Sequence, residues 1–232
     1  MALPYVLKLL GKTLPLLAAS FAVLAQDIPQ PTIEWMHSAE ALEATVTPTT
    51  RWLSDNRLVL YDVRKPPAER TVEILDPVSG KRTVLIDQNA ARASLRTVLG
   101  DSATPTFLPF PQELAGNGKT ALYIFKGDAF VLDIPSLSFS RVTETPAQES
   151  CVRLSPDGSR VAYVRGNNLY VYDRTMKAER QLTGDGSDSL RNGTLSWVYW
   201  EEVFGRNDLG YWWSPDSRAI AYFRTDESGV ST

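Results

Sequence analysis

Short apolar runs separated by polar turns recur along most of the chain. Residues 154–163 (LSPDGSRVAY) return as 213–222 (WSPDSRAIAY), and weaker copies occupy 52–61 and 116–123. The tyrosines that end these copies are Tyr61, Tyr123, Tyr163 and Tyr222, spaced by 62, 40 and 59 residues. This spacing brackets and slightly exceeds the ~40 to 50 residues of one propeller blade. The pattern therefore predicts a repeat architecture.

Each copy continues in the same order. In the third copy a strand over 161–164 is followed by a Gly-Asn-Asn turn, a strand over 169–173 and a further run at 180–183. Turns of this composition reverse the chain between neighbouring strands. Four-stranded meanders stacked radially make a propeller, so we predict an all-β β-propeller of about four blades. A sandwich or barrel is the competing fold, and no helix is expected after residue 48.

The N-terminus has the features of a secretory signal. Lys8 and Lys12 precede a short apolar run over 14–24, and Ala25 is a small residue suited to cleavage. The run is shorter than the ~20 residues that span a bilayer, so we expect a cleaved signal and a secreted or periplasmic protein. An uncleaved signal would be a membrane anchor. The expected segments are a signal peptide (1–25), a lead-in (26–48) and a partial propeller (49–232).

Composition excludes several kinds of chemistry. The 24 Lys and Arg residues are spread among 27 Asp and Glu without a basic block, so no nucleic-acid surface is predicted. Cys151 is the only cysteine, which rules out an intrachain disulfide, and we expect it to be buried at a strand edge. His37 is the only histidine and no Gly-x-Ser-x-Gly motif occurs, so these residues cannot build a Ser-His-Asp triad. We interpret His37 as a surface or packing residue and predict no metal or cofactor.

One segment breaks the repeat. Residues 184–211 run from a polar loop into 195–204 (LSWVYWEEVF), which is dense in aromatic residues and contains adjacent acids. Insertions in repeat proteins often lie on one face and carry function, and simple loop decoration is the alternative. The segment also contains Asn192-Gly193-Thr194, which matches an N-glycosylation acceptor.

This segment resembles a known family. Residues 197–204 (WVYWEEVF), followed by 212–216 (WWSPD) and an apolar strand, are similar to the double-glutamate segment of dipeptidyl peptidase IV enzymes, serine peptidases of the prolyl-oligopeptidase clan. The likeness is specific over 149–226 and general over 49–143. It implies that the chain is a truncated part of an eight-bladed propeller that caps an α/β-hydrolase domain. The catalytic residues would then lie in a C-terminal domain absent from this chain.

The resemblance maps the two glutamates that bind a substrate's N-terminal ammonium onto Glu201 and Glu202. An ammonium has three N–H donors and no acceptor, so two carboxylates satisfy both its charge and its hydrogen bonds. Neighbours on a regular helix point ~100° apart, so both can reach one cation only at a helix end or an irregular turn. We expect Trp197 and Tyr199 to pack around that turn.

The match is incomplete at three points. Ser196 stands where an aspartate commonly precedes the tryptophan, and Trp200 stands where the family often has a third acid or amide. The family also uses an arginine from an earlier blade to hold a substrate carbonyl. Arg141 and Arg153 lie within blade repeats and are interpreted as surface residues, so that arginine is unassigned.

The resemblance implies the substrate-gating part of a secreted dipeptidyl peptidase that releases Xaa-Pro or Xaa-Ala dipeptides. Its partners would be peptides with a free N-terminus, and a homodimer is allowed. The chain alone should be inactive. The main alternative is a non-catalytic envelope propeller that binds a protein or a glycan. An endopeptidase or acylaminoacyl peptidase of the same clan is disfavoured, because a blocked N-terminus offers no ammonium to the glutamate pair.

Overall fold

The computed structural model describes residues 32–230 and divides into two units, 1–44 and 45–232. The first unit contains α1 (Ile33–Met36) and the start of α2 (Ala39–Thr45). Thr32 caps α1, since its hydroxyl oxygen accepts a hydrogen bond from the amide of Trp35 at 3.1 Å. His37 lies exposed at the end of α1, which confirms the surface interpretation. The predicted signal peptide lies outside the described residues, and no described helix is long and apolar enough to cross a membrane.

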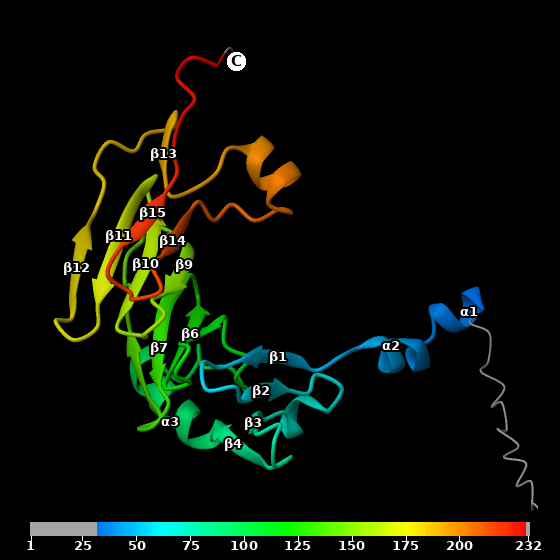
Figure 1. Cartoon of the computed structure of the whole chain (residues 1–232). Coiled ribbons are helices and arrows are strands. Elements are labelled where there is room, and N and C mark those ends of the chain that lie inside the picture. Colours follow the sequence, from blue (N-terminus) through cyan, green and yellow to red (C-terminus); the bar gives the residue numbers. More distant parts are fainter. Residues whose placement is uncertain (1–31, 231–232) are drawn as a thin grey trace, which may run out of the picture. The chain divides into compact units, whose positions relative to one another are not determined.

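The second unit is built from antiparallel sheets, which confirms the all-β propeller prediction (Figure 1). Three four-stranded meanders follow one another, each with strands paired in sequence order. They comprise β1 (Thr49–Trp52), β2 (Leu58–Tyr61), β3 (Val72–Leu75) and β4 (Arg82–Ile86); β5 (Glu113–Leu114), β6 (Thr120–Phe125), β7 (Asp128–Asp133) and β8 (Ser138–Arg141); and β9 (Ser150–Leu154), β10 (Arg160–Arg165), β11 (Asn168–Asp173) and β12 (Ala178–Gln181).

The turn before the second strand repeats in conformation as well as in sequence. Its last residue has positive φ in every copy, and its amide donates to the carbonyl three residues earlier. The four residues are Asn56, Gly118, Gly158 and Ser217, with φ of 64°, 69°, 77° and 61°. Glycine is required at Gly158, where a Cβ would lie 2.9 Å from the Cβ of Thr120 in the preceding blade.

The blades pack face to face, with a hydrophobic cluster between each neighbouring pair. In β6, Ala121 and Tyr123 belong to the cluster shared with the first blade, and Leu122 belongs to the cluster shared with the third. The second blade is therefore buried on both faces, unlike a sheet of a two-layer sandwich. The turns are also joined across blades, because the amide of Ser54 donates to Gly116 at 2.8 Å and that of Gly116 to Pro156 at 3.1 Å.

The link between the first two blades departs from the prediction of no helix after residue 48. A full helix, α3 (Gln88–Leu99), lies in this link, and a 3₁₀ turn, η1 (Pro67–Glu69), lies between β2 and β3 of the first blade. Asp87 caps α3 by accepting from the amides of Asn89 and Ala90, and Ala91 and Leu95 are fully buried on its inner face. The expectation was wrong because one helical stripe, Ala91 and Leu95, is enough to dock this helix on the first core cluster.

A fourth sheet region follows the third blade. It comprises β13 (Leu190–Asn192), β14 (Tyr211–Trp213), β15 (Ile220–Tyr222) and β16 (Arg224–Asp226). β15 pairs antiparallel with β14, and β16 pairs antiparallel with β13. β14, β15 and the third blade share a further hydrophobic cluster, which contains Leu169, Val171 and the buried Tyr211.

Candidate functional site

The double-glutamate loop leaves the middle of a strand. β15 pairs with β14, and β16, which follows β15 in the chain, pairs with β13. β13 and β14 therefore form one interrupted strand beside β15 and β16. Residues 195–208 form a loop between the two halves, closed at its base by an antiparallel bridge between Thr194 and Leu209. In Figure 1 this segment, drawn in orange, projects away from the strands. The insertion that breaks the sequence repeat is therefore a loop extruded from one strand.

Two glycines close the interrupted strand. The amide of Gly210 donates to the carbonyl of Gly193 at 2.9 Å, and the amide and carbonyl of Phe223 bond the two glycines from the neighbouring strand. Gly193 has φ of 83°, which favours glycine. A Cβ on Gly210 would lie 2.9 Å from the carbonyl carbon of Thr194, so a side chain there would push the legs of the loop apart.

The glutamates lie on a π-helical turn, η2 (Tyr199–Val203). The amide of Phe204 donates to the carbonyl of Tyr199 five residues earlier, at 2.9 Å. The amide of Trp200 keeps an ordinary helical bond to Ser196 at 3.0 Å. Single π-helical turns are frequent at functional sites. Glu201 and Glu202 thus lie on an irregular turn of the kind that adjacent side chains need to approach one cation.

The two carboxylates differ in their surroundings. Glu201 is half-buried and lies 3.6 Å from the guanidinium of Arg206, which is itself 77% exposed. Glu202 is exposed and has no hydrogen bond or ion pair within the described part of the chain. One carboxylate therefore has a loose, solvated partner and the other has unused acceptor capacity.

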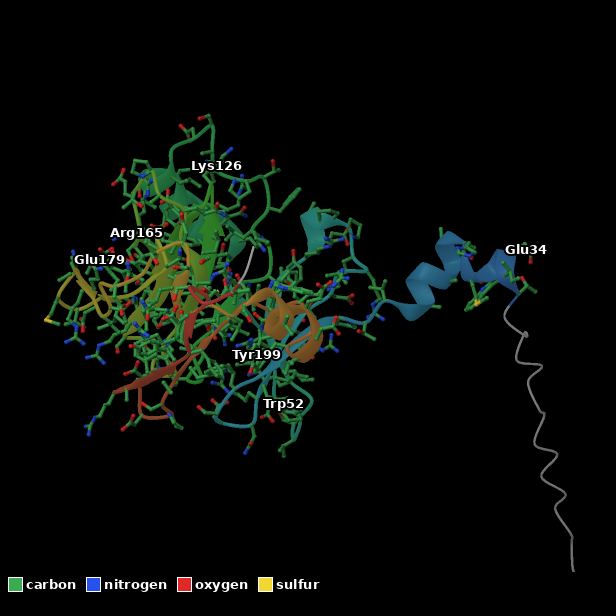
Figure 2. The ribbon with its side chains drawn as sticks, turned by 90° about the horizontal axis from the view of Figure 1, so that it is seen from above. Glu34, Trp52, Lys126, Arg165, Glu179 and Tyr199 are labelled. Atoms are coloured by element: carbon green, nitrogen blue, oxygen red, sulfur yellow. The ribbon has the colours of Figure 1, made fainter. Side chains whose placement is uncertain are left out.

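Aromatic rings lie beneath the turn. Tyr199 contacts Phe223 with ring centroids 6.3 Å apart, and Phe204 contacts Trp212 at 6.2 Å. Trp212 and Phe223 meet edge to face at 5.7 Å, which joins the two contacts into one cluster. Tyr199, labelled in Figure 2, nevertheless remains 51% exposed. Trp197 is 61% exposed and lines a separate shallow groove with Val198 and Thr225.

The polar loop before β13 supports the base of the insertion. Asp185 accepts hydrogen bonds from the side-chain Nδ2 of Asn192 at 2.9 Å and from the guanidinium of Arg224 at 3.0 and 3.1 Å. These bonds lower the pKa of Asp185. Asn192 is fully buried and its side-chain nitrogen is used in this bond, so the glycosylation motif does not present an accessible acceptor.

The arginines considered for the substrate carbonyl are engaged in ion pairs, Arg141 within the second blade and Arg153 across to the second blade from the third. Arg141 contacts Asp128 at 2.6 Å and Glu144 at 2.7 Å, and Arg153 contacts Glu113 at 2.8 Å. Both side chains are partly exposed and already paired with acids, so neither is a free cation. Over residues 32–230, no three His, Cys, Asp or Glu side chains gather as a metal site.

The sequence did not predict the contacts between the third blade and the base of the loop. Cys151 is half-buried rather than buried, and it lies in β9 at φ of 53°, beside a register shift in the β9–β10 pairing. Tyr211 is fully buried and its hydroxyl bonds the carbonyls of Cys151 and Ala162. The glycines on either side of the break in the repeat, Gly193 and Gly210, were a signal that could have located the loop base.

The double-glutamate segment lies in the region that matches known proteins. Residues 119–232 match the family described as dipeptidyl peptidase IV (DPP IV) N-terminal region. Dipeptidyl aminopeptidase B of Saccharomyces cerevisiae is 41% identical over 105 residues, covering 45% of this chain and 12% of the yeast protein. Probable dipeptidyl peptidase 4 of Aspergillus clavatus is 37% identical over 112 residues, covering 47% of this chain and 14% of that protein. The chain thus spans a small part of these relatives.

Solved structures agree in fold. Porphyromonas gingivalis dipeptidyl peptidase 4 matches with a TM-score of 0.58 and 25% identity, over 79% of this chain and 26% of that one. A dipeptidyl aminopeptidase IV from Bacteroides ovatus, described as putative, matches with a TM-score of 0.54 and 19% identity, over 80% of this chain and 24% of that one. The family match over 119–232 includes the double-glutamate loop. Residues 119–232 are therefore similar to the N-terminal region of the dipeptidyl peptidase IV family.

Proposed function

We propose that this chain supplies the substrate-gating propeller region of a serine-type dipeptidyl peptidase, with Glu201 and Glu202 binding the substrate's N-terminal ammonium. The observation that carries the proposal is the π-helical turn, which holds adjacent carboxylates outside the sheet. Glu202 keeps its acceptors free, and Glu201 has only the exposed Arg206 beside it. An incoming ammonium can therefore bond both without breaking a buried pair.

The same arrangement explains why dipeptides would be released. If the ammonium is fixed at a set distance from a nucleophile, only the bond after the second residue reaches that nucleophile. The pair would act as a ruler and would select peptides with a free N-terminus. A second residue of proline or alanine is part of the proposal through the family resemblance. Blocked N-termini would be rejected, since they carry no ammonium.

The proposal places the chemical step outside residues 1–232. His37 is the chain's only histidine, it lies exposed beside α1, and no Gly-x-Ser-x-Gly motif is present. We therefore propose that residues 49–232 act with a catalytic α/β-hydrolase domain encoded further along and are inactive alone. Sequencing beyond codon 232 tests this directly. A continuing frame with Gly-x-Ser-x-Gly, then Asp and His, is expected, and a frame without them would favour a non-catalytic propeller.

The N-terminal part of the proposal concerns export. Residues 1–25 would be removed as a signal peptide and residues 26–48 would lead into the propeller. Mass spectrometry of exported protein should find Gln26 at the N-terminus. Detection of Met1 on exported protein would instead favour a membrane anchor.

Single substitutions in the complete peptidase test the glutamate pair. Charge-assisted hydrogen bonds contribute ~1.5 to 3 kcal/mol each, so Glu201→Ala or Glu202→Ala should lower kcat/KM by roughly one to two decades. Glutamine keeps an acceptor without the charge and should recover little. Glu144→Ala is the matched control, since Glu144 is an exposed acid that pairs within its own blade. Unchanged dipeptide release in both alanine variants would show that the pair is only an acidic turn.

A further inference from the structure

The returning leg of the double-glutamate loop is tied to an irregularity in the third blade. The pairing of β9 with β10 shifts register between Ala162 and Val164, and Cys151 adopts a left-handed conformation there. A β-bulge of this kind interrupts the ladder and leaves main-chain groups in need of other partners. Bulges are also common beside active sites, where they redirect neighbouring groups. The bulge at Cys151 lies where the loop rejoins its strand.

Tyr211 supplies the missing partner. It is the first residue of β14 after the loop, and its side chain is 1% exposed. Its hydroxyl lies within hydrogen-bond distance of the carbonyl of Ala162, at 2.8 Å, and of the carbonyl of Cys151. A hydroxyl has one proton, which these two acceptors share. Burial raises the pKa of Tyr211 well above its ordinary value, so that proton is retained.

A second bond joins the same bulge to the same leg. The thiol of Cys151 donates to a carboxylate oxygen of Asp208 at 3.3 Å. Burial, with the nearby Asp208, raises the pKa of Cys151 to about 12, which keeps the thiol protonated as a donor. Asp208 also accepts through its carbonyl from the amide of Leu195 at 3.1 Å, and that bond joins the two legs. The bulge residue thus contacts the loop through both its main chain and its side chain.

We propose that Tyr211 is a positioning residue for Glu201 and Glu202, acting through the bulge at Cys151 to fix the base of their loop on the third blade. The ammonium role of the pair rests on the proposed function, whereas the anchoring of the loop does not. The proposed role belongs to the Tyr211 hydroxyl. Tyr211→Phe removes that hydroxyl and keeps the ring packed in the cluster with Val164 and Leu169, so it tests the hydroxyl alone.

Hydrogen–deuterium exchange on the full 232-residue chain tests the anchoring. Tyr211→Phe should speed exchange of the amides of Leu195 and Gly210 by about 2-fold to 10-fold, the range expected for losing one hydrogen bond. Exchange in the first blade should not change. Tyr123→Phe is the matched control, because Tyr123 is equally buried but its hydroxyl has no hydrogen-bond partner among the described residues. Equal exchange in Tyr211→Phe and wild type would overturn the proposal.

Two substitutions of Cys151 test the hydrogen bond from its thiol to Asp208. Cys151→Ala removes the donor to Asp208, and Cys151→Ser restores a hydroxyl donor at the same atom position. Exchange at Leu195 should rise in the alanine variant and return toward the wild-type rate in the serine variant. If the Leu195 amide exchanges at the same rate in the alanine and serine variants, the bond from Cys151 to Asp208 does not help to anchor the loop.

Kinetics in the complete peptidase separate positioning from stability. Tyr211→Phe should lower kcat/KM for a substrate with a free N-terminus by about 3-fold to 10-fold, mainly through KM. In a Glu201→Ala/Glu202→Ala background the same change should have no further effect, because its action passes through those carboxylates. An equal loss in both backgrounds would indicate a merely structural residue and overturn the proposal.

The two proposals fail differently. If the glutamate variants retain full activity, the proposed function is wrong, and the exchange experiment still decides whether Tyr211 anchors the loop. If the glutamate variants lose activity while Tyr211→Phe matches wild type, the function stands and the positioning role is wrong.

Discussion

The third blade and the loop that follows it use aromatic and aliphatic residues in opposite ways. In β10, Val161, Ala162 and Tyr163 are fully buried. In the loop, Trp197, Tyr199 and Val203 are 61%, 51% and 63% exposed. The blade residues stabilise the fold by leaving water. The loop residues do so only in small part, so their apolar surface is available to a ligand or to another part of the protein.

Ion pairs differ between the two regions in the same way. Figure 2 labels Arg165 and Glu179, which lie beside each other on the third blade. Arg165 bonds Glu179 at 2.5 Å, contacts the buried Glu149 at 3.5 Å and stacks over the ring of Tyr170 at 4.3 Å. In the loop, Glu201 has only the exposed Arg206 at 3.6 Å. The blade uses its charges in a fixed network, and the loop leaves its charges to solvent.

The largest expected effect tests the difference in burial. Tyr163→Ala removes a fully buried ring that stacks on Tyr170 at 5.9 Å, so the free energy of unfolding should fall by about 3 to 5 kcal/mol. Tyr199→Ala, in the loop, should cost less than about 1 kcal/mol. Equilibrium urea unfolding of the 232-residue chain measures both. Similar losses in the two variants would contradict the contrast between blade and loop.

The junction between the two regions should show an intermediate effect. Gly210→Ala places a Cβ 2.9 Å from the main chain of Thr194, and such crowding typically costs about 1 to 3 kcal/mol. Gly184→Ala is the control, because the nearest atom to its Cβ would be the Gln181 side-chain nitrogen at 3.8 Å. Urea unfolding should separate the two variants. A neutral Gly210→Ala would mean that the loop base adjusts without strain.

The sequence predicted the repeated blades but not the helix that follows the first blade. The blades repeat because each must bury apolar residues at fixed spacing behind the same turn, and this local rule is visible in 154–163 and 213–222. Helix α3 was missed because a docking stripe of Ala91 and Leu95 is too short to stand out among strands.

The site was predicted only in part, for a physical reason. Residues 197–204 identify the double-glutamate segment, and the need for an irregular turn follows from side-chain directions on a regular helix. The anchor could not be predicted, because Cys151, Asp208 and Tyr211 meet only after the third blade has folded. Their sequence separations of 57 and 60 residues leave no local pattern.

Acid should weaken the ion-pair network of the third blade. Burial by itself would raise the pKa of Glu179, but hydrogen bonds from Arg165 and Tyr163 outweigh it and hold that pKa below 4.5. A lowered pKa gives stability that is present above 4.5 and is lost as the pH falls through the folded-state value. Glu179→Gln should therefore be less stable than wild type at pH 7, and the difference should shrink below about pH 4.5. Urea midpoints measured from pH 7 to 3 test this, and a constant difference would show that Glu179 does not titrate with unfolding.

The smallest expected effect concerns the loose pair in the loop. Exposed ion pairs contribute ~0 to 1 kcal/mol, so Arg206→Ala should change the free energy of unfolding by less than about 0.5 kcal/mol. If Glu201 binds the substrate ammonium as proposed, removing this cation from the complete peptidase should leave Glu201 more available to it. KM for a free-N-terminus substrate should then fall, by no more than about fivefold. Arg191→Ala is the control, because Arg191 pairs with Glu227 outside the loop at 3.3 Å and should leave KM unchanged. A large rise in KM for Arg206→Ala would show that Arg206 itself binds the substrate, and the loop would then be a mixed-charge site in place of a carboxylate pair.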